Sequence, residues 1–211
     1  MQNIKAANQL KIDTVIKNME KRGIRGYYCE TKEEARDMVL SMIPDQCVVS
    51  WGGSMTINAL GVKEKLAEKG MTTIDPYSTT DPEEGIKRRR QGLTADCFLM
   101  SSNAITMDGE LVNIDGTSNR VAALCFGPKK VIVVAGANKL AHRLNDALER
   151  AKLYAAVANN VRLKTGNPCT VTGDCNNCLS KTCICCNIVT TRFCSTPDRI
   201  HVILVNENIG F

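Results

Sequence analysis

Apolar residues recur at helical spacing along the first segment of the chain, and Gly23 follows them. This pattern predicts an amphipathic helix over residues 3–21. Thr31 and Glu34 form the sequence pattern of a capping box, which predicts a second helix that stops at Pro44. Further helices are expected over three ranges, which are Ser54 to about Lys69, 81–92 and 140–163.

Short apolar runs between these helices predict strands, and Asp108-Gly109 between two apolar runs predicts a hairpin of 105–107 with 111–113. The run 131–134 is uniformly apolar, as expected of a parallel strand that is covered on both faces. The expected strands are 26–29, 47–51, 72–74, 96–101, 121–126, 131–134 and 200–205.

The order of these elements predicts an α/β fold, with an open sheet and helices on both of its faces. From residue 165 to 194 the pattern gives way to Gly, Asn, Pro, Thr and Cys. We therefore expect a single domain over residues 1–211, with a Cys-rich metal-binding insertion at 165–194 before its last strand.

Composition narrows the class of protein further. The formal net charge of +5 is mild and no long basic tract is present, so a nucleic-acid partner is not expected. The first residues lack the apolar core of a signal peptide, and no apolar stretch has bilayer length, so neither export nor a membrane partner is expected. A cytoplasmic location is the resulting expectation, in which the 11 cysteines stay mostly reduced.

Seven cysteines and no histidine lie between residues 169 and 194. Spacings of two residues, as in Cys175 to Cys178 and Cys183 to Cys186, allow two thiolates to face one ion from a tight turn. Core filling by small cysteines and a redox dithiol at Cys175 and Cys178 are the alternatives to a metal site. Spacing alone does not separate zinc from iron–sulfur.

A glycine-rich turn, Gly52-Gly53-Ser54 followed by Thr56, joins a predicted strand to a predicted helix. Backbone N–H groups and hydroxyls at such a turn can bind an anion. A tight turn with Ser54 as helix N-cap explains the same residues without a ligand. The turn matches neither a Walker A loop nor a dinucleotide-binding fingerprint.

A second polar block, Ser101 to Val121, lies between apolar strands, where polar side chains at strand ends can converge on a ligand. The Arg120 guanidinium suits a carboxylate or phosphate. The alternative is a hairpin and loop whose polar residues satisfy their own backbone. The basic run 87–90 is expected to be a solvated helix face, and neither histidine is assigned a catalytic role.

The block from Ser101 to Lys139, which ends in Phe126-Gly127-Pro128 and Ala135-Gly136-Ala137-Asn138-Lys139, resembles the LUD-domain (lactate-utilisation) family. The resemblance extends from the N-terminal helix to Ile209-Gly210-Phe211. It implies the fold of sugar-phosphate isomerases, folinate cyclo-ligases and CoA transferases, whose active sites lie at strand C-termini. The ligand-binding residues implied in this way are Gly52, Gly53, Ser54, Thr56, Asn103, Asn119, Arg120 and Asn138.

The cysteine tail also resembles that of stand-alone members of this family. The cysteines with counterparts, which the resemblance implies as metal ligands, are Cys169, Cys175, Cys178 and Cys186; Cys183, Cys185 and Cys194 are extras. The implied cofactor is an iron–sulfur cluster of the 4Fe–4S type, with zinc as the alternative.

Three hypotheses follow, and they leave open whether the chain is an enzyme. The first is an iron–sulfur redox protein or enzyme that acts on a small organic acid. The second is a non-redox protein that binds a carboxylate- or phosphate-bearing metabolite and carries structural zinc. The third is an accessory subunit whose tail docks a redox partner protein; self-association into a homo-oligomer is left open.

Overall fold

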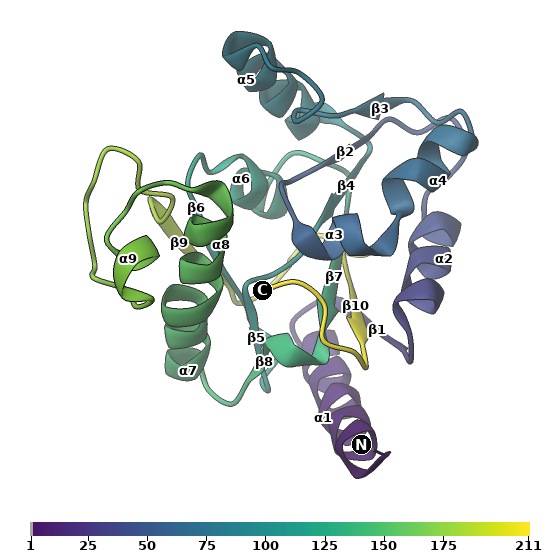
Figure 1. Ribbon diagram of the computed structural model, residues 1–211. Helices are drawn as coiled ribbons and strands as arrows, with labels where there is room; N and C mark the ends of the chain where they lie inside the picture. Colours follow the sequence, from purple (N-terminus) through teal and green to yellow (C-terminus); the bar gives the residue numbers. More distant parts are fainter. Residues whose placement is uncertain (1) are drawn as a thin grey trace.

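The computed structural model describes residues 2–211 and is built around a parallel sheet of six strands in the order β1-β10-β7-β4-β2-β3 (Figure 1). Every neighbouring pair in this sheet is parallel. All six strands therefore end at the same edge. The strands are β1 (Arg25–Cys29), β2 (Val49–Trp51), β3 (Thr73–Ile74), β4 (Cys97–Met100), β7 (Lys130–Gly136) and β10 (Ile200–Val205).

The central strand β7 explains why its sequence is apolar throughout. Its odd-numbered residues, such as Val131 and Val133, pack in one hydrophobic cluster, and its even-numbered residues Ile132 and Val134 pack in another. Successive side chains of a strand point to opposite faces, so both faces of β7 are buried.

Helices cover both faces, as the sequence predicts. Helices α1 and α6 supply apolar side chains to one cluster, and α2, α3 and α4 supply them to the other. Their bounds are α1 (Gln2–Glu20), α2 (Lys32–Met42), α3 (Met55–Leu60), α4 (Val62–Glu68) and α6 (Asn119–Cys125). Helix α5 (Pro82–Gln91) and the turn η1 (Gly92–Thr94) lead from the edge strand β3 into β4.

A second sheet of four strands, β8-β5-β6-β9, lies beside the first. The predicted hairpin forms its centre, with Ala104 opposite Val112 and Ile105 opposite Leu111. Alanines of the helical layer, Ala147, Ala151 and Ala156, pack on its buried face. The remaining bounds are β5 (Ala104–Thr106), β6 (Leu111–Asp115), η2 (Ala137–Lys139), β8 (Leu140–Ala141), α7 (Leu144–Glu149), the π-helical turn η3 (Arg150–Ala155), α8 (Ala156–Leu163), α9 (Cys169–Thr172) and β9 (Asn187–Thr191).

Several sequence expectations are wrong in detail. The predicted strand 121–126 is helix α6, because Val121 and Leu124 share one helical face and short apolar runs do not by themselves separate helix from strand. The predicted helix from Ser54 is broken at Gly61, whose φ of 65° is left-handed. The helix expected from residue 140 begins at Leu144, and the Cys-rich segment contributes α9 and β9.

No helix within residues 2–211 is both long and apolar enough to cross a lipid bilayer.

A buried arginine fastens the last strand to helix α6. Arg199 donates hydrogen bonds to the Ala123, Leu124 and Pro128 carbonyls at 2.7, 2.7 and 3.1 Å, and is 8% exposed. The first two carbonyls lie in the last turn of α6, where no helical N–H can reach them.

We expect Arg199→Met to lower the free energy of unfolding by roughly 2–4 kcal/mol, because three buried carbonyls lose a charged donor. Urea unfolding followed by circular dichroism measures this loss. Arg25→Ala is the matched control, because the ion pair of Arg25 with Asp198 is solvent-exposed and should contribute less than about 1 kcal/mol. Equal losses in the two variants would contradict the assignment.

Candidate functional site

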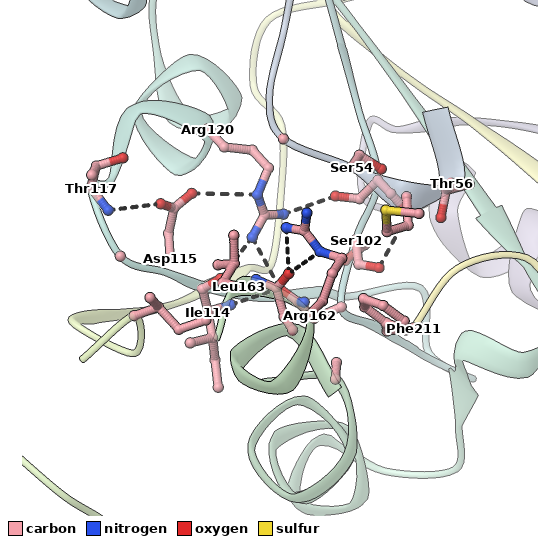
Figure 2. Close-up of a pocket in the computed structure, with 18 of the residues that line it drawn as sticks. Ser54, Thr56, Ser102, Ile114, Asp115, Thr117, Arg120, Arg162, Leu163 and Phe211 are labelled. Atoms are coloured by element: carbon pink, nitrogen blue, oxygen red, sulfur yellow. Dashed lines mark hydrogen bonds and ion pairs between the residues drawn. The ribbon is translucent and has the colours of Figure 1, made fainter. Parts of the chain in front are cut away.

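Three neighbouring strands of the main sheet end around one cavity of about 280 Å³. Strand β2 leads to Gly53 and Ser54, β4 leads to Ser101, and β7 leads to Lys139, and all of these residues line the cavity. The carboxyl edge of a parallel sheet is where α/β proteins most often bind small molecules. Figure 2 shows Ser54 and Thr56 on one side of the Arg120 guanidinium and Asp115 and Thr117 on the other. We refer to this cavity as the anion pocket.

Lys139 lies in the wall of the anion pocket and is only 3% exposed. Its Nζ donates to Thr56 Oγ1 and Ser101 Oγ, both at 2.9 Å. Burial, and then the nearby Arg150 and Arg120 guanidinium groups, lower the pKa of Lys139 to about 7. Within residues 2–211 this amine forms no ion pair. The pocket thus holds a buried amine that lacks a counter-charge.

Arg120 is also buried, but its donors are already occupied. It donates to the Ser101 and Ile114 carbonyls and to the Asn103 and Asn113 side-chain oxygens, at 2.5 to 3.0 Å. Its Nε lies 3.3 Å from Asp115 Oδ2.

Four N–H donors of the guanidinium are therefore hydrogen-bonded, and Nε is held in the ion pair with Asp115. Arg120 therefore shapes the pocket and adds positive charge, while direct contact with a ligand falls to other groups.

Two further arginines line the rim of the pocket, one from α5 and one from α8. The Arg89 guanidinium of α5 lies 5.7 Å from the Tyr77 ring centroid, and its buried Nε has no hydrogen-bond acceptor among the described residues. Arg162 of α8 is exposed and donates only to Asn159 Oδ1. Tyr77 accepts a hydrogen bond from the Gly53 N–H at 2.7 Å. The rim therefore offers hydrogen-bond donors to a bound carboxylate or phosphate.

A second, smaller cavity of about 90 Å³ gathers five thiols, and we call it the thiol cavity. Helix α8 and the segment after it form its walls. The cysteines that line it are Cys169, Cys175, Cys178, Cys183 and Cys185.

The thiols of this cavity differ in their acidity. Hydrogen bonds from the backbone and side chain of Ser180 lower the pKa of Cys178. Burial, and then the neighbouring Cys183, raise the pKa of Cys185 to about 12. The Cys183 sulfur accepts a hydrogen bond from the Cys185 N–H at 3.3 Å.

The donor chemistry of this cavity fits a thiophilic metal ion or cluster, because it consists of sulfur alone. In the described part of the chain, no three Cys, His, Asp or Glu side chains lie close enough together to ligate an ion as they stand. Metal binding would require the thiols to move closer together.

The two cavities share walls. Ala155 and Asn159 line the anion pocket, while Ala156 and Asn160, the next residues of the same helical segment, line the thiol cavity. Ile184 likewise lines the anion pocket, while its neighbours Cys183 and Cys185 line the thiol cavity. One layer of chain therefore separates the thiols from the pocket.

Comparison with known proteins identifies the family. The LUD domain model matches residues 12–205, which is nearly the whole chain. The chain belongs to the LUD-domain family. This membership connects it, at a general level, with lactate utilisation.

One solved structure supports the fold of this LUD-domain chain. A DUF162 family protein from Deinococcus radiodurans, at 16% identity, aligns with a TM-score of 0.51 over 95% of this chain and 98% of that one. The delta subunit of eIF2B from Chaetomium thermophilum aligns over only 57% of this chain and 54% of its own, with 20% identity and a TM-score of 0.35. The search of curated proteins found no match.

The LUD-domain structure brings together six of the eight residues expected to bind a ligand, which are Gly53, Ser54, Thr56, Asn103, Asn119 and Arg120. Gly52 lies behind the pocket, where a Cβ would come 3.0 Å from the Arg120 side chain. Asn138 fastens the end of the chain, because it donates to the Gly210 carbonyl and accepts from the Ile209 N–H. Ser54 also caps α3 through the Ile57 N–H, as the alternative interpretation predicts.

Of the four cysteines expected as ligands, Cys169, Cys175 and Cys178 line the thiol cavity. Cys186 is exposed, and its Sγ donates to the Cys183 carbonyl at 3.3 Å. Cys183 and Cys185, considered extras from the sequence, face the cavity instead. Cys194 is buried in the main core, in the cluster that contains Met19 and Ile24.

Sequence reasoning missed three cationic residues of the pocket. Lys139 ends the short helix η2 that follows the apolar strand β7, and a cation so close to the end of a buried strand is the signal that could have found it. Arg89 belongs to the basic run that was expected to be solvated, and Arg162 lies in a long helix with no motif.

The lowered pKa of Lys139 gives the folded protein a specific pH dependence. Below about pH 7 both folded and unfolded chains carry this proton; above it the folded chain releases the proton, while the unfolded chain keeps it up to its ordinary pKa of 10.5. Stability rises with pH wherever the unfolded chain binds more protons, so Lys139 should add roughly 1–3 kcal/mol between about pH 6 and pH 9.

Urea unfolding across this pH range, with Lys139→Met compared with the wild type, measures that contribution. The variant should lack the rise. Lys129→Met, which removes an exposed lysine near Asp96, should retain it. Parallel curves for the wild type and Lys139→Met would contradict a lowered pKa.

Proposed function

We propose that this LUD-domain protein binds a small organic acid in the anion pocket and holds an iron–sulfur cluster, of the 4Fe–4S type, in the adjoining thiol cavity. The wall that the two cavities share is the observation that carries this proposal. A cluster there would supply one-electron transfer or a Lewis-acidic iron. The residues that would hold it are Cys169, Cys175 and Cys178, with a fourth thiolate from the segment 183–186.

The charge of the anion pocket supports an acidic ligand. Lys139, Arg120, Arg89 and Arg162 contribute four cationic side chains, while Asp115 is the single carboxylate residue of the lining and is already paired with Arg120. A carboxylate or phosphate would therefore gain charged donors on entry. The pocket volume of about 280 Å³ suits a metabolite of a few carbon atoms.

The side chains have separate roles in this proposal. Arg89 and Arg162 donate to the acid at the rim. Lys139 provides the buried positive charge, which a bound anion would stabilise. Arg120 holds Ser101 and Asn103 in place, and Ile184 keeps the acid apart from the thiols.

Two alternatives remain under test. The same thiolates suit a structural zinc ion, in a protein that only binds a metabolite. A redox accessory subunit is favoured by Val171 and Leu179, which are 86% and 100% exposed on the Cys-rich segment. Co-purification with a flavin or iron–sulfur protein would favour the accessory role.

Calorimetry with lactate or inorganic phosphate at about pH 6 tests the anion pocket. Arg89→Ala and Lys139→Met should each weaken binding by roughly tenfold or more, because each removes a charged donor worth about 1.5–3 kcal/mol. Lys87→Ala is the matched control, since Lys87 lies on the same helix, is exposed and pairs with Glu84. Affinity should also fall as pH rises through about 7, where Lys139 loses its proton. Equal affinities in all variants would contradict the proposal.

Metal analysis with visible absorption, on protein prepared without oxygen, tests the thiol cavity. We expect iron with sulfide and a broad charge-transfer absorption; one zinc per chain without colour would favour the alternative. Cys175→Ser should lower the bound metal by roughly tenfold, because it removes a ligand. Cys194→Ser is the matched control, since that thiol lies in the main core. Equal metal contents in the two variants would contradict the assignment.

Cys185→Ser and Cys186→Ser distinguish the source of the fourth thiolate. Because Cys185 lines the cavity and Cys186 is exposed, we expect only Cys185→Ser to change the cobalt(II) absorption spectrum of the reconstituted protein. The resemblance to the family implies the opposite result, with Cys186 as the ligand.

A further inference from the structure

We propose that Lys139 is the reactive amine of the anion pocket and condenses with the carbonyl carbon of a small 2-oxo acid to form an imine. This inference rests on the proposed function, because the pocket must first hold the carboxylate of the acid. It goes further in naming the substrate class and the reacting atom.

The contacts of Lys139 set it apart from the paired lysines on the surface. Lys5 and Lys129 each place Nζ within 3.0 Å of a carboxylate oxygen. Such a partner holds an amine in its protonated form, which has no lone pair to react. The Nζ of Lys139 has two hydroxyl partners instead, Thr56 and Ser101. A hydroxyl can rotate to donate as well as accept, so these contacts are also compatible with a neutral amine.

The charges that face Lys139 also oppose its protonation. The positive charges of Arg150 in η3 and Arg120 in α6 act on it, while α3 and the end of β4 supply only the two hydroxyls. Burial acts in the same direction, and the resulting pKa of about 7 leaves a large neutral fraction near neutral pH. Lysines that form imines are activated in this way, by desolvation or by a neighbouring cation.

The rest of the pocket suits a 2-oxo acid. Arg89 and Arg162 lie in the same lining as Lys139 and can hold the carboxylate. In the condensation, Nζ bonds to the carbonyl carbon, and the carbonyl oxygen leaves as water with the two hydrogens of the neutral amine. Nothing is oxidised or reduced. The Ser101 and Thr56 hydroxyls lie within hydrogen-bond distance of Nζ and can transfer these protons.

Trapping with pyruvate and sodium cyanoborohydride tests this inference on the intact protein. Hydride reduces the imine to a secondary amine, which fixes the pyruvate carbons on the lysine. Intact mass spectrometry and peptide mapping should show one dominant adduct at Lys139. The adduct should be lost in Lys139→Arg and reduced at least several-fold in Arg89→Ala.

Lys63→Arg is the matched control, because Lys63 is half-buried, also has a lowered pKa and lies over the Trp51 ring, outside the anion pocket. It should retain the full yield of adduct at Lys139. Lactate, which has no carbonyl to condense, should give no adduct and should compete with pyruvate.

Adducts spread over surface lysines, or a wild-type chain left unlabelled at Lys139, would overturn the inference. Calorimetry with lactate separates this failure from failure of the pocket itself. Lactate binding that depends on Arg89, without trapping, would leave the proposed function in place and reject the imine. Absence of both would reject both proposals.

Discussion

The buried guanidinium of Arg120 connects the two sheets. It donates a hydrogen bond to the Ser101 carbonyl at the end of β4. It also donates to the Asn113 side chain and the Ile114 carbonyl in the second sheet. Asp115 balances its charge. A buried cation is costly unless it is paired and hydrogen-bonded, and Arg120 has four hydrogen bonds and one ion pair. Because these contacts determine where the β5–β6 hairpin lies, they also determine the shape of the anion pocket.

A second cation in the same region is left without such compensation. Lys139 lies beside Arg120 and Arg150 and meets only hydroxyls. A fold selected for stability alone would replace this amine with an apolar side chain, because burial penalises its charged form. Groups whose pKa is shifted by both burial and neighbouring charges gather at functional sites. The contrast between a satisfied arginine and an unsatisfied lysine therefore points to Lys139 as the group that acts on a ligand.

The thiol cavity adds a second chemistry beside the first. Residues 183–185, which lie between α9 and β9, contribute to the walls of both cavities. Cys183 and Cys185 line the thiol cavity, and Ile184 lines the anion pocket. Any rearrangement that draws the thiols together around a metal would act on the same short segment. The two cavities therefore share this segment of wall.

The sequence by itself determined the α/β class, most of the helices and strands and the polar turns at the strand ends. These features depend on local periodicity, capping and turn residues, which a chain carries before it folds. The apolar run 131–134 predicted a strand buried on both faces, and this strand is β7. The dipeptide Asp108-Gly109 predicted the hairpin of the second sheet. The family resemblance located six residues of the pocket lining.

Only the tertiary structure decided the rest. Helix α6 and the second sheet depend on long-range packing, and the six-residue apolar run 121–126 is too short to reveal its period. Lys139, Arg89 and Arg162 come from three distant elements, so no spacing in the sequence unites them. Residues 185 and 186 are adjacent and identical, and only the direction of the chain turns one thiol into the cavity and the other to solvent. Strand pairing, burial and the charges around a side chain all arise between segments that are distant in the sequence. These interactions determine which side chains can bind a ligand or react.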